Sequence, residues 1–232
     1  MLNIDKPTKQ AIIISIAVIL AFFIFYSGYS KEKKALDFSL LYKIISFEDY
    51  TFSIKEINKL SALAGLTLLA MAFLPGPLSK LWPQIFSKYL VLRKPIGIIG
   101  FLLILLHSYL SFVYYYKSDF YGALFNNPKV SAFIAALIAF IIFTAMALTS
   151  TKEAVNKMGY EKWKLLQRTG YIALALSLIH FIIIETKPDI GFDVRPFAYI
   201  ALIIALLTLL LRIYVHIRKA PERKSYEEHF RA

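Results

Sequence analysis

The sequence of 232 residues contains no cysteine. This absence excludes disulfide bonds, thiolate zinc sites, iron–sulfur clusters held by thiolates and a cysteine nucleophile. Any bound metal or cofactor must therefore be held by histidine, methionine or oxygen ligands. Histidine is scarce too, with four in the chain. Acidic residues are also few, with 15 aspartates and glutamates against 27 lysines and arginines.

Hydrophobic residues are abundant, at 58% of the chain, and the mean hydropathy is +0.60. A soluble domain of this size cannot bury so much apolar surface in one core. Several runs are nearly free of charge and long enough to cross a bilayer, which takes about 18 residues or more. The sequence therefore predicts an all-α integral membrane six-helix bundle, forming a single domain over residues 1–232. The predicted spans are about 11–29, 60–74, 95–116, 130–148, 163–184 and 196–216.

Prolines mark the ends of several spans. The triplet Pro75-Gly76-Pro77 is expected to break the second span, whereas Pro95 suits the first turn of the third. The apolar segment 81–91 is interrupted by proline and lysine, so we expect it to lie at the membrane interface. The first span is longer than the hydrophobic region of a usual signal peptide and is expected to remain as an uncleaved helix.

The net charge of +12 would suit a nucleic-acid partner, but the basic residues lie mostly between the hydrophobic runs. Lysine and arginine in such positions set membrane topology and contact lipid head groups. We therefore predict a lipid environment and no nucleic acid. Most of the basic residues fall on one side if both termini are cytoplasmic, which predicts a multi-pass protein of the plasma or inner membrane.

Two histidines lie inside predicted spans, where ionisable side chains are costly and usually functional. His107 is 14 residues past Arg93 on the third span, and His180 is 16 residues past Lys164 on the fifth. These offsets correspond to rises of roughly 21 and 24 Å along two parallel helices. Both imidazoles are therefore expected at a similar height, in the outer half of the bilayer.

Histidines that face each other across bundle helices can bind the two sides of a haem iron. Three alternatives remain open: simple hydrogen bonds to backbone or to Ser108, Ser111 or Ser177, a proton relay in a small transporter or channel, and a cofactor-free scaffold. Small residues such as Gly97, Gly100 and Gly170 would leave room for a macrocycle or serve close helix packing. Of the remaining histidines, His229 is expected to be solvated in the tail, and His216 is expected at the inner end of the sixth helix, where a polar residue costs little.

Two segments carry a family resemblance. The first is Leu92-Arg93-Lys94-Pro95-Ile96-Gly97, followed by Leu105-Leu106-His107; the second runs from Leu148-Thr149-Ser150-Thr151 through Gly159, Trp163, Leu166-Gln167-Arg168 and Tyr171 to His180. On these residues the chain resembles the ferric-reductase-like transmembrane domain family, and within it the MsrQ-type haem-binding membrane subunits.

The resemblance implies a b-type haem between the third and fifth helices, with His107 and His180 as its metal ligands. It also implies electron transfer from quinol or a cytosolic flavin reductase to an outer-face acceptor, such as a periplasmic methionine sulfoxide reductase. The chain shows no Gly-rich dinucleotide fingerprint and no NADPH- or FAD-binding domain. We therefore expect an electron-transfer subunit of an oxidoreductase, which needs a donor and a partner.

The sequence departs from the two-haem relatives, which place paired histidines 13 or 14 residues apart on these helices. The corresponding positions hold Gln167 and Arg93, and neither side chain is a good haem ligand. One outer haem is therefore expected, and a second would be weak at most, unless His216 supplied a ligand. A quinone or FMN near Arg93, Gln167 and Arg168 would help bridge the remaining distance, although both arginines could equally bind haem propionates or lipid phosphate.

Overall fold

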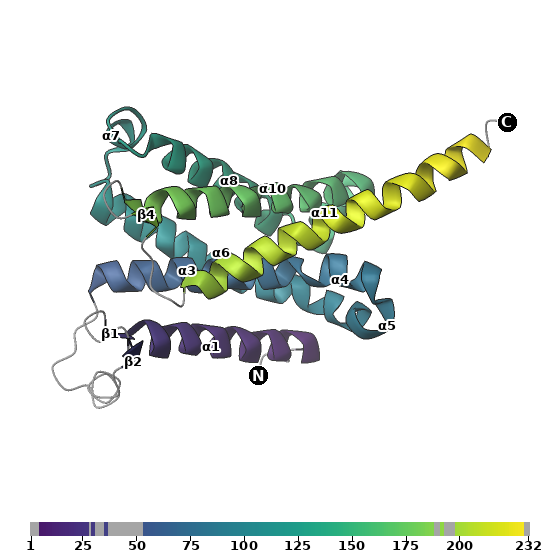
Figure 1. Cartoon of the computed structure of the whole chain (residues 1–232), viewed down its shortest axis with the longest axis horizontal. Helices are drawn as coiled ribbons and strands as arrows, with labels where there is room; N and C mark the ends of the chain where they lie inside the picture. Colours follow the sequence, from purple (N-terminus) through teal and green to yellow (C-terminus); the bar gives the residue numbers. More distant parts are fainter. Residues whose placement is uncertain are drawn as a thin grey trace.

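The computed structural model describes residues 5–27, 29–30, 35–36, 53–187, 191–192 and 198–229, and nearly all of them are helical (Figure 1). The helices are α1 (Lys6–Ser27), α3 (Ile54–Phe73), α4 (Pro75–Leu81), α5 (Pro83–Phe86), the 3-10 helix η1 (Ser87–Leu92), α6 (Arg93–Leu110), the π-helical turn η2 (Ser111–Tyr115), α7 (Phe120–Phe125), α8 (Val130–Leu148), α9 (Lys152–Met158), α10 (Tyr160–Glu185) and α11 (Ala198–His229). Two antiparallel ladders of two-residue strands join β1 (Tyr29–Ser30) to β2 (Ala35–Leu36) and β3 (Thr186–Lys187) to β4 (Gly191–Phe192).

Six segments of the described chain are long and apolar enough to cross a membrane, which confirms the predicted all-α membrane bundle. They are Lys6–Phe25, Ile54–Leu81, Pro83–Tyr115, Val130–Leu148, Tyr160–Glu185 and Ala198–Arg218. Large apolar side chains point outward from these helices; Leu102 and Tyr109 on α6, for example, are 55% and 62% exposed. Such a surface is stable in contact with lipid rather than with water.

The second span begins earlier than the apolar run indicates. Ser53 and Glu56 form a capping box, in which each side chain binds the other residue's backbone N–H, so that α3 begins at Ile54. At its other end the predicted break is slight, because Leu74 keeps helical dihedral angles and its N–H donates to the Ala70 carbonyl. The first turn of α4 tolerates proline, which has no N–H to leave unpaired there.

The segment expected at the interface, 81–91, forms the short helices α5 and η1 before α6 begins. Several sequence predictions lie outside the described residues: residue 28 in the first span, residues 196–197 at the start of the sixth, and most of the polar loop between the first two spans.

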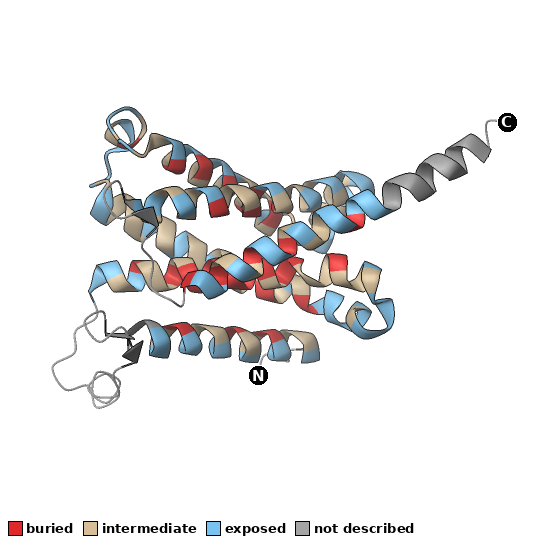
Figure 2. Ribbon diagram, in the orientation of Figure 1, coloured by how far each residue is buried: buried red, intermediate tan, exposed pale blue. Residues whose placement is uncertain are grey.

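Helix α3 lies at the centre of the bundle and packs against α1, α6 and α11, while α8 packs against α10 (Figure 1). Buried residues gather along α3 and on the faces turned toward it (Figure 2). Helices α3 and α6 approach most closely at Gly65 and Gly100, where a Cβ added to Gly100 would lie 3.0 Å from the Leu69 nitrogen. Gly170 on α10 likewise makes room for Phe73 and Met146. These glycines therefore serve helix packing.

The α3–α6 crossing also fixes which polar residues meet. Asn58 lies seven residues before Gly65, and His107 lies seven residues after Gly100. Seven residues are about two helical turns, so Asn58 lies on the same face of α3 as Gly65, and His107 lies on the same face of α6 as Gly100. Because the two helices run in opposite directions, the close contact at the glycines brings Asn58 against His107.

Candidate functional site

The structure brings together the two intramembrane histidines, His107 of α6 and His180 of α10. Their ring centroids are 6.3 Å apart, and the ring planes are inclined by 69°. Both side chains are partly buried between helices rather than turned outward. Two residues that are 73 positions apart in the chain thus form one site, at the end of the bundle where α6 and α10 terminate.

Each imidazole is held through its Nδ1 atom. His180 Nδ1 lies 2.9 Å from the Ala132 carbonyl oxygen, and His107 Nδ1 lies 2.8 Å from Asn58 Oδ1 and 3.2 Å from the Asn58 carbonyl oxygen. A carbonyl oxygen only accepts hydrogen bonds, so Nδ1 carries the proton and donates it in both rings. The Nε2 atom of each ring then keeps its lone pair, as a metal ligand requires.

The distance between the rings fits a shared metal ion. Two metal–nitrogen bonds of about 2 Å on opposite sides of one ion would place the ring centroids roughly 6 Å apart. Among the described residues, no hydrogen bond involves either Nε2 atom, and no group of three or more His, Cys, Asp or Glu side chains could hold a metal ion alone. Two imidazoles at this separation therefore suit a metal whose other positions are filled by a bound group.

Lys129 fixes the helix ends around His180. Its Nζ donates to the carbonyl oxygens of Ile183, Ile184 and Thr186 at 2.7–3.0 Å. The last carbonyls of a helix have no partner within the helix, and a cation there is favourable. Lys129 immediately precedes α8, so this clamp joins the start of α8, which carries Ala132, to the end of α10. No pattern in the sequence indicates this role, because it depends on two helices lying side by side.

Replacing Lys129 with methionine should destabilise this end of the bundle. The variant leaves several carbonyl groups without their charged donor, which we expect to cost about 1–3 kcal/mol. Thermal unfolding in detergent would show this as a lower midpoint temperature. Lys152→Met, at an exposed position of α9, is the matched control. Equal melting of the two variants would contradict the proposed clamp.

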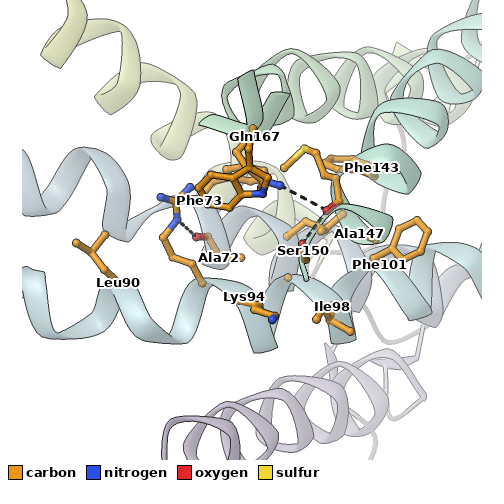
Figure 3. Close-up of a pocket in the computed structure, with 15 residues that line it drawn as sticks. Ala72, Phe73, Leu90, Lys94, Ile98, Phe101, Phe143, Ala147, Ser150 and Gln167 are labelled. Atoms are coloured by element: carbon orange, nitrogen blue, oxygen red, sulfur yellow. Dashed lines mark hydrogen bonds between the residues drawn. The ribbon is translucent and has the colours of Figure 1, made fainter. Parts of the chain in front are cut away.

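A cavity of about 240 Å³ lies nearer the other end of the same helices (Figure 3). Of the site residues indicated by the sequence, Arg93 and Gln167 line it, whereas Arg168 is exposed and does not. His216 is exposed on α11 and is also absent from the lining. The full lining is Leu69, Ala72, Phe73, Leu90, Arg93, Lys94, Gly97, Ile98, Phe101, Phe143, Met146, Ala147, Ser150, Trp163 and Gln167.

Arg93 and Gln167, two polar residues of the cavity, are anchored to backbone carbonyls. Arg93 Nε donates to the Ala72 carbonyl at 3.1 Å, and its guanidinium lies 5.9 Å from the centre of the Phe73 ring. Gln167 Nε2 donates to the Met146 carbonyl at 3.4 Å (Figure 3). At Gly97 the nearest atom to an added Cβ would be the Ala72 Cβ, at 3.6 Å. A Cβ at Gly97 would therefore make an ordinary van der Waals contact, whereas a Cβ at Gly65, Gly100 or Gly170 would clash with its neighbours.

A helical membrane bundle with two neighbouring histidines on different helices is typical of integral membrane proteins that carry a metal cofactor. The comparison with known families gives the particular class. The model of the ferric reductase like transmembrane component matches residues 61–178, about half of the chain, and the chain belongs to this family. The match runs from α3 into α10; it includes His107 and ends two residues before His180.

Individual relatives are similar over about half of the chain. The chain is 34% identical over 131 residues to the protein-methionine-sulfoxide reductase heme-binding subunit MsrQ of Pasteurella multocida, covering 56% of this chain and 61% of that protein. It is 30% identical over 124 residues to the magnetosome protein MamZ of Magnetospirillum gryphiswaldense, and 27% identical to MamZ of Paramagnetospirillum magneticum, covering 52% of this chain and 18% of each MamZ. The chain thus spans less than two thirds of the length of these relatives.

Proposed function

We propose that this protein binds one b-type haem between α6 and α10, through His107 and His180, and transfers electrons within the membrane. The observation that carries the proposal is the pair of rings 6.3 Å apart, each with its Nδ1 atom committed to a protein oxygen. The similarity to a heme-binding subunit supports it. A bound haem would supply reversible one-electron chemistry, while the protein supplies ligands, orientation and a water-poor environment.

The cavity is proposed as the place of a second redox group, a quinone or FMN. Arg93 and His107 are separated by about 20 Å of rise along α6, so a single haem leaves most of one membrane leaflet to be crossed. Phe73, Phe143 and Trp163 offer aromatic surface for a flat ring, and Arg93 offers hydrogen bonds to a carbonyl or phosphate oxygen. The volume of 240 Å³ lies just below the usual range for small-ligand pockets, about 300–1,000 Å³, which favours a quinone head group over a second macrocycle.

The direction of transfer follows from the proposed topology, with both termini in the cytoplasm and the histidine pair toward the outer face of the inner membrane. Electrons would enter from quinol or a cytosolic flavin reductase and leave to an outer-face acceptor, such as a methionine sulfoxide reductase. Arg168, being exposed, is proposed to contact lipid phosphate rather than the cavity.

Purified protein from cells supplied with haem should be coloured. We expect a Soret band and an α band that sharpen on reduction with dithionite, with the pyridine haemochrome spectrum of haem b and one haem per chain. A colourless preparation would reject the proposal. Two haems per chain would show that the positions held by Arg93 and Gln167 do not prevent a second site from forming.

A further inference from the structure

Asn58 is a buried polar residue whose side chain points at the candidate metal site. It lies on α3 and is 4% exposed. Burying an amide is costly unless its donors and acceptors are satisfied. Its side-chain partners lie across the α3–α6 contact, on α6 and the adjoining turn η2. Asn58 Nδ2 donates to Ser111 Oγ at 3.0 Å, and Asn58 Oδ1 accepts from His107 Nδ1 at 2.8 Å.

The surrounding structure sets the direction of this amide. Ser61 Oγ donates to the Asn58 carbonyl at 2.9 Å, which ties the first turns of α3 together. Ser111 begins the π-helical turn η2, four residues after His107, and such turns often occur at functional sites. The Ser111 hydroxyl lies 3.0 Å from the amide nitrogen and 3.4 Å from the amide oxygen, and the shorter of these contacts, together with the proton on His107 Nδ1, places the amide oxygen toward the imidazole.

The two histidines therefore have chemically different partners. His180 donates to the backbone carbonyl of Ala132, which no side-chain substitution removes. His107 donates mainly to a side chain. Within the part of the chain that the structure describes, Asn58 is the one residue whose side chain hydrogen-bonds to either ring. It is thus the one position at which a substitution can alter the hydrogen bonding of a ligand directly.

We propose that Asn58 is the positioning residue of His107, and that the hydrogen bond from Nδ1 to its amide oxygen helps to set the midpoint potential of the haem. This inference rests on the proposed function. An acceptor on Nδ1–H fixes the tautomer and orientation of the ring and increases electron donation from Nε2. Greater donation stabilises ferric over ferrous iron and lowers the potential, so a weaker acceptor raises it.

The test is the midpoint potential of purified Asn58→Leu, measured by redox titration of the α band. The backbone carbonyl of residue 58, 3.2 Å from His107 Nδ1, remains as a weaker acceptor, so haem should stay bound. We expect the midpoint potential to rise, which corresponds to an about threefold to tenfold shift of the equilibrium from ferric toward ferrous haem. A tenfold shift equals 59 mV for one electron. Ser111→Ala, which frees the amide to rotate but keeps the acceptor, should give a smaller rise.

Thr67→Val is the matched control. Thr67 lies on the same helix, is 3% exposed and donates its hydroxyl to the Leu63 carbonyl, so the variant also loses a buried polar group but has no contact with His107. Its potential should equal that of the wild type. If Asn58→Leu keeps the wild-type potential, or Thr67→Val shifts as much, the role of Asn58 is rejected. If Asn58→Leu does not fold, an unshifted Ser111→Ala rejects it. A wild-type chain without haem would instead reject the proposed function itself.

Discussion

Replacing His107 or His180 with alanine is expected to abolish the low-spin haem spectrum of the purified protein. Each imidazole supplies one of the two bonds between protein and iron in the proposed site, and the described residues offer no cluster of metal ligands to replace it. Loss of a ligand should cost more than the roughly 10- to 100-fold in affinity that follows loss of a ligand's hydrogen-bond partner. The double variant should therefore retain no haem after purification.

The control for this result is His216→Ala, which removes an exposed imidazole from α11. Its spectrum and haem content should match the wild type. The melting temperature of each variant, measured without added haem, would separate loss of a ligand from loss of the fold. Full absorbance in both single variants would mean that the iron is bound elsewhere.

Filling the cavity at Gly97 is expected to slow reduction of the haem by quinol without affecting reduction by dithionite. Gly97→Phe adds a ring where the nearest atom to the new Cβ is 3.6 Å away, so the side chain can enter the space proposed for the quinone head group. We expect the rate of haem reduction by a soluble quinol analogue to fall about tenfold or more. A tenfold fall corresponds to a loss of about 1.4 kcal/mol in the free energy of quinol binding. The measurement is the rate of appearance of the α band after mixing.

Leu102→Phe provides the matched control on the same helix. Leu102 is 55% exposed and does not line the cavity, so its variant adds an aromatic ring outside it. It should be reduced by quinol at the wild-type rate. If Gly97→Phe is also reduced at that rate, quinol binds at another site, and the cavity has no part in electron entry.

The main features of the fold could be predicted from the sequence because a bilayer imposes simple lengths on apolar helices. The span at 130–148 agrees with α8, which begins after Lys129 and ends with the apolar run at Leu148, before the polar residues Thr149, Ser150 and Thr151. The start of α3 could not be found in this way, since it depends on a capping box outside the apolar run. Ser53 and Glu56 do carry the sequence signature of such a box, so this signal was present.

The candidate site was predictable only in part. His107 and His180 could be paired because depth in a membrane follows from sequence offset. Asn58 and Lys129 could not be found, because their roles depend on how each helix is rotated against its neighbour. Gln167 and Arg168 show the same limit: they adjoin in the motif, but successive helical residues point about 100° apart, and only Gln167 lines the cavity.

Each histidine shares a helical hairpin with its own hydrogen-bond acceptor. The α3–α6 hairpin holds His107 with Asn58, and the α8–α10 hairpin holds His180 with the Ala132 carbonyl. Each half of the site can therefore be complete while the chain is still being inserted into the membrane, before the halves meet. A metal bound by both histidines would then cross-link the two helical hairpins, and its binding would fix their position relative to each other.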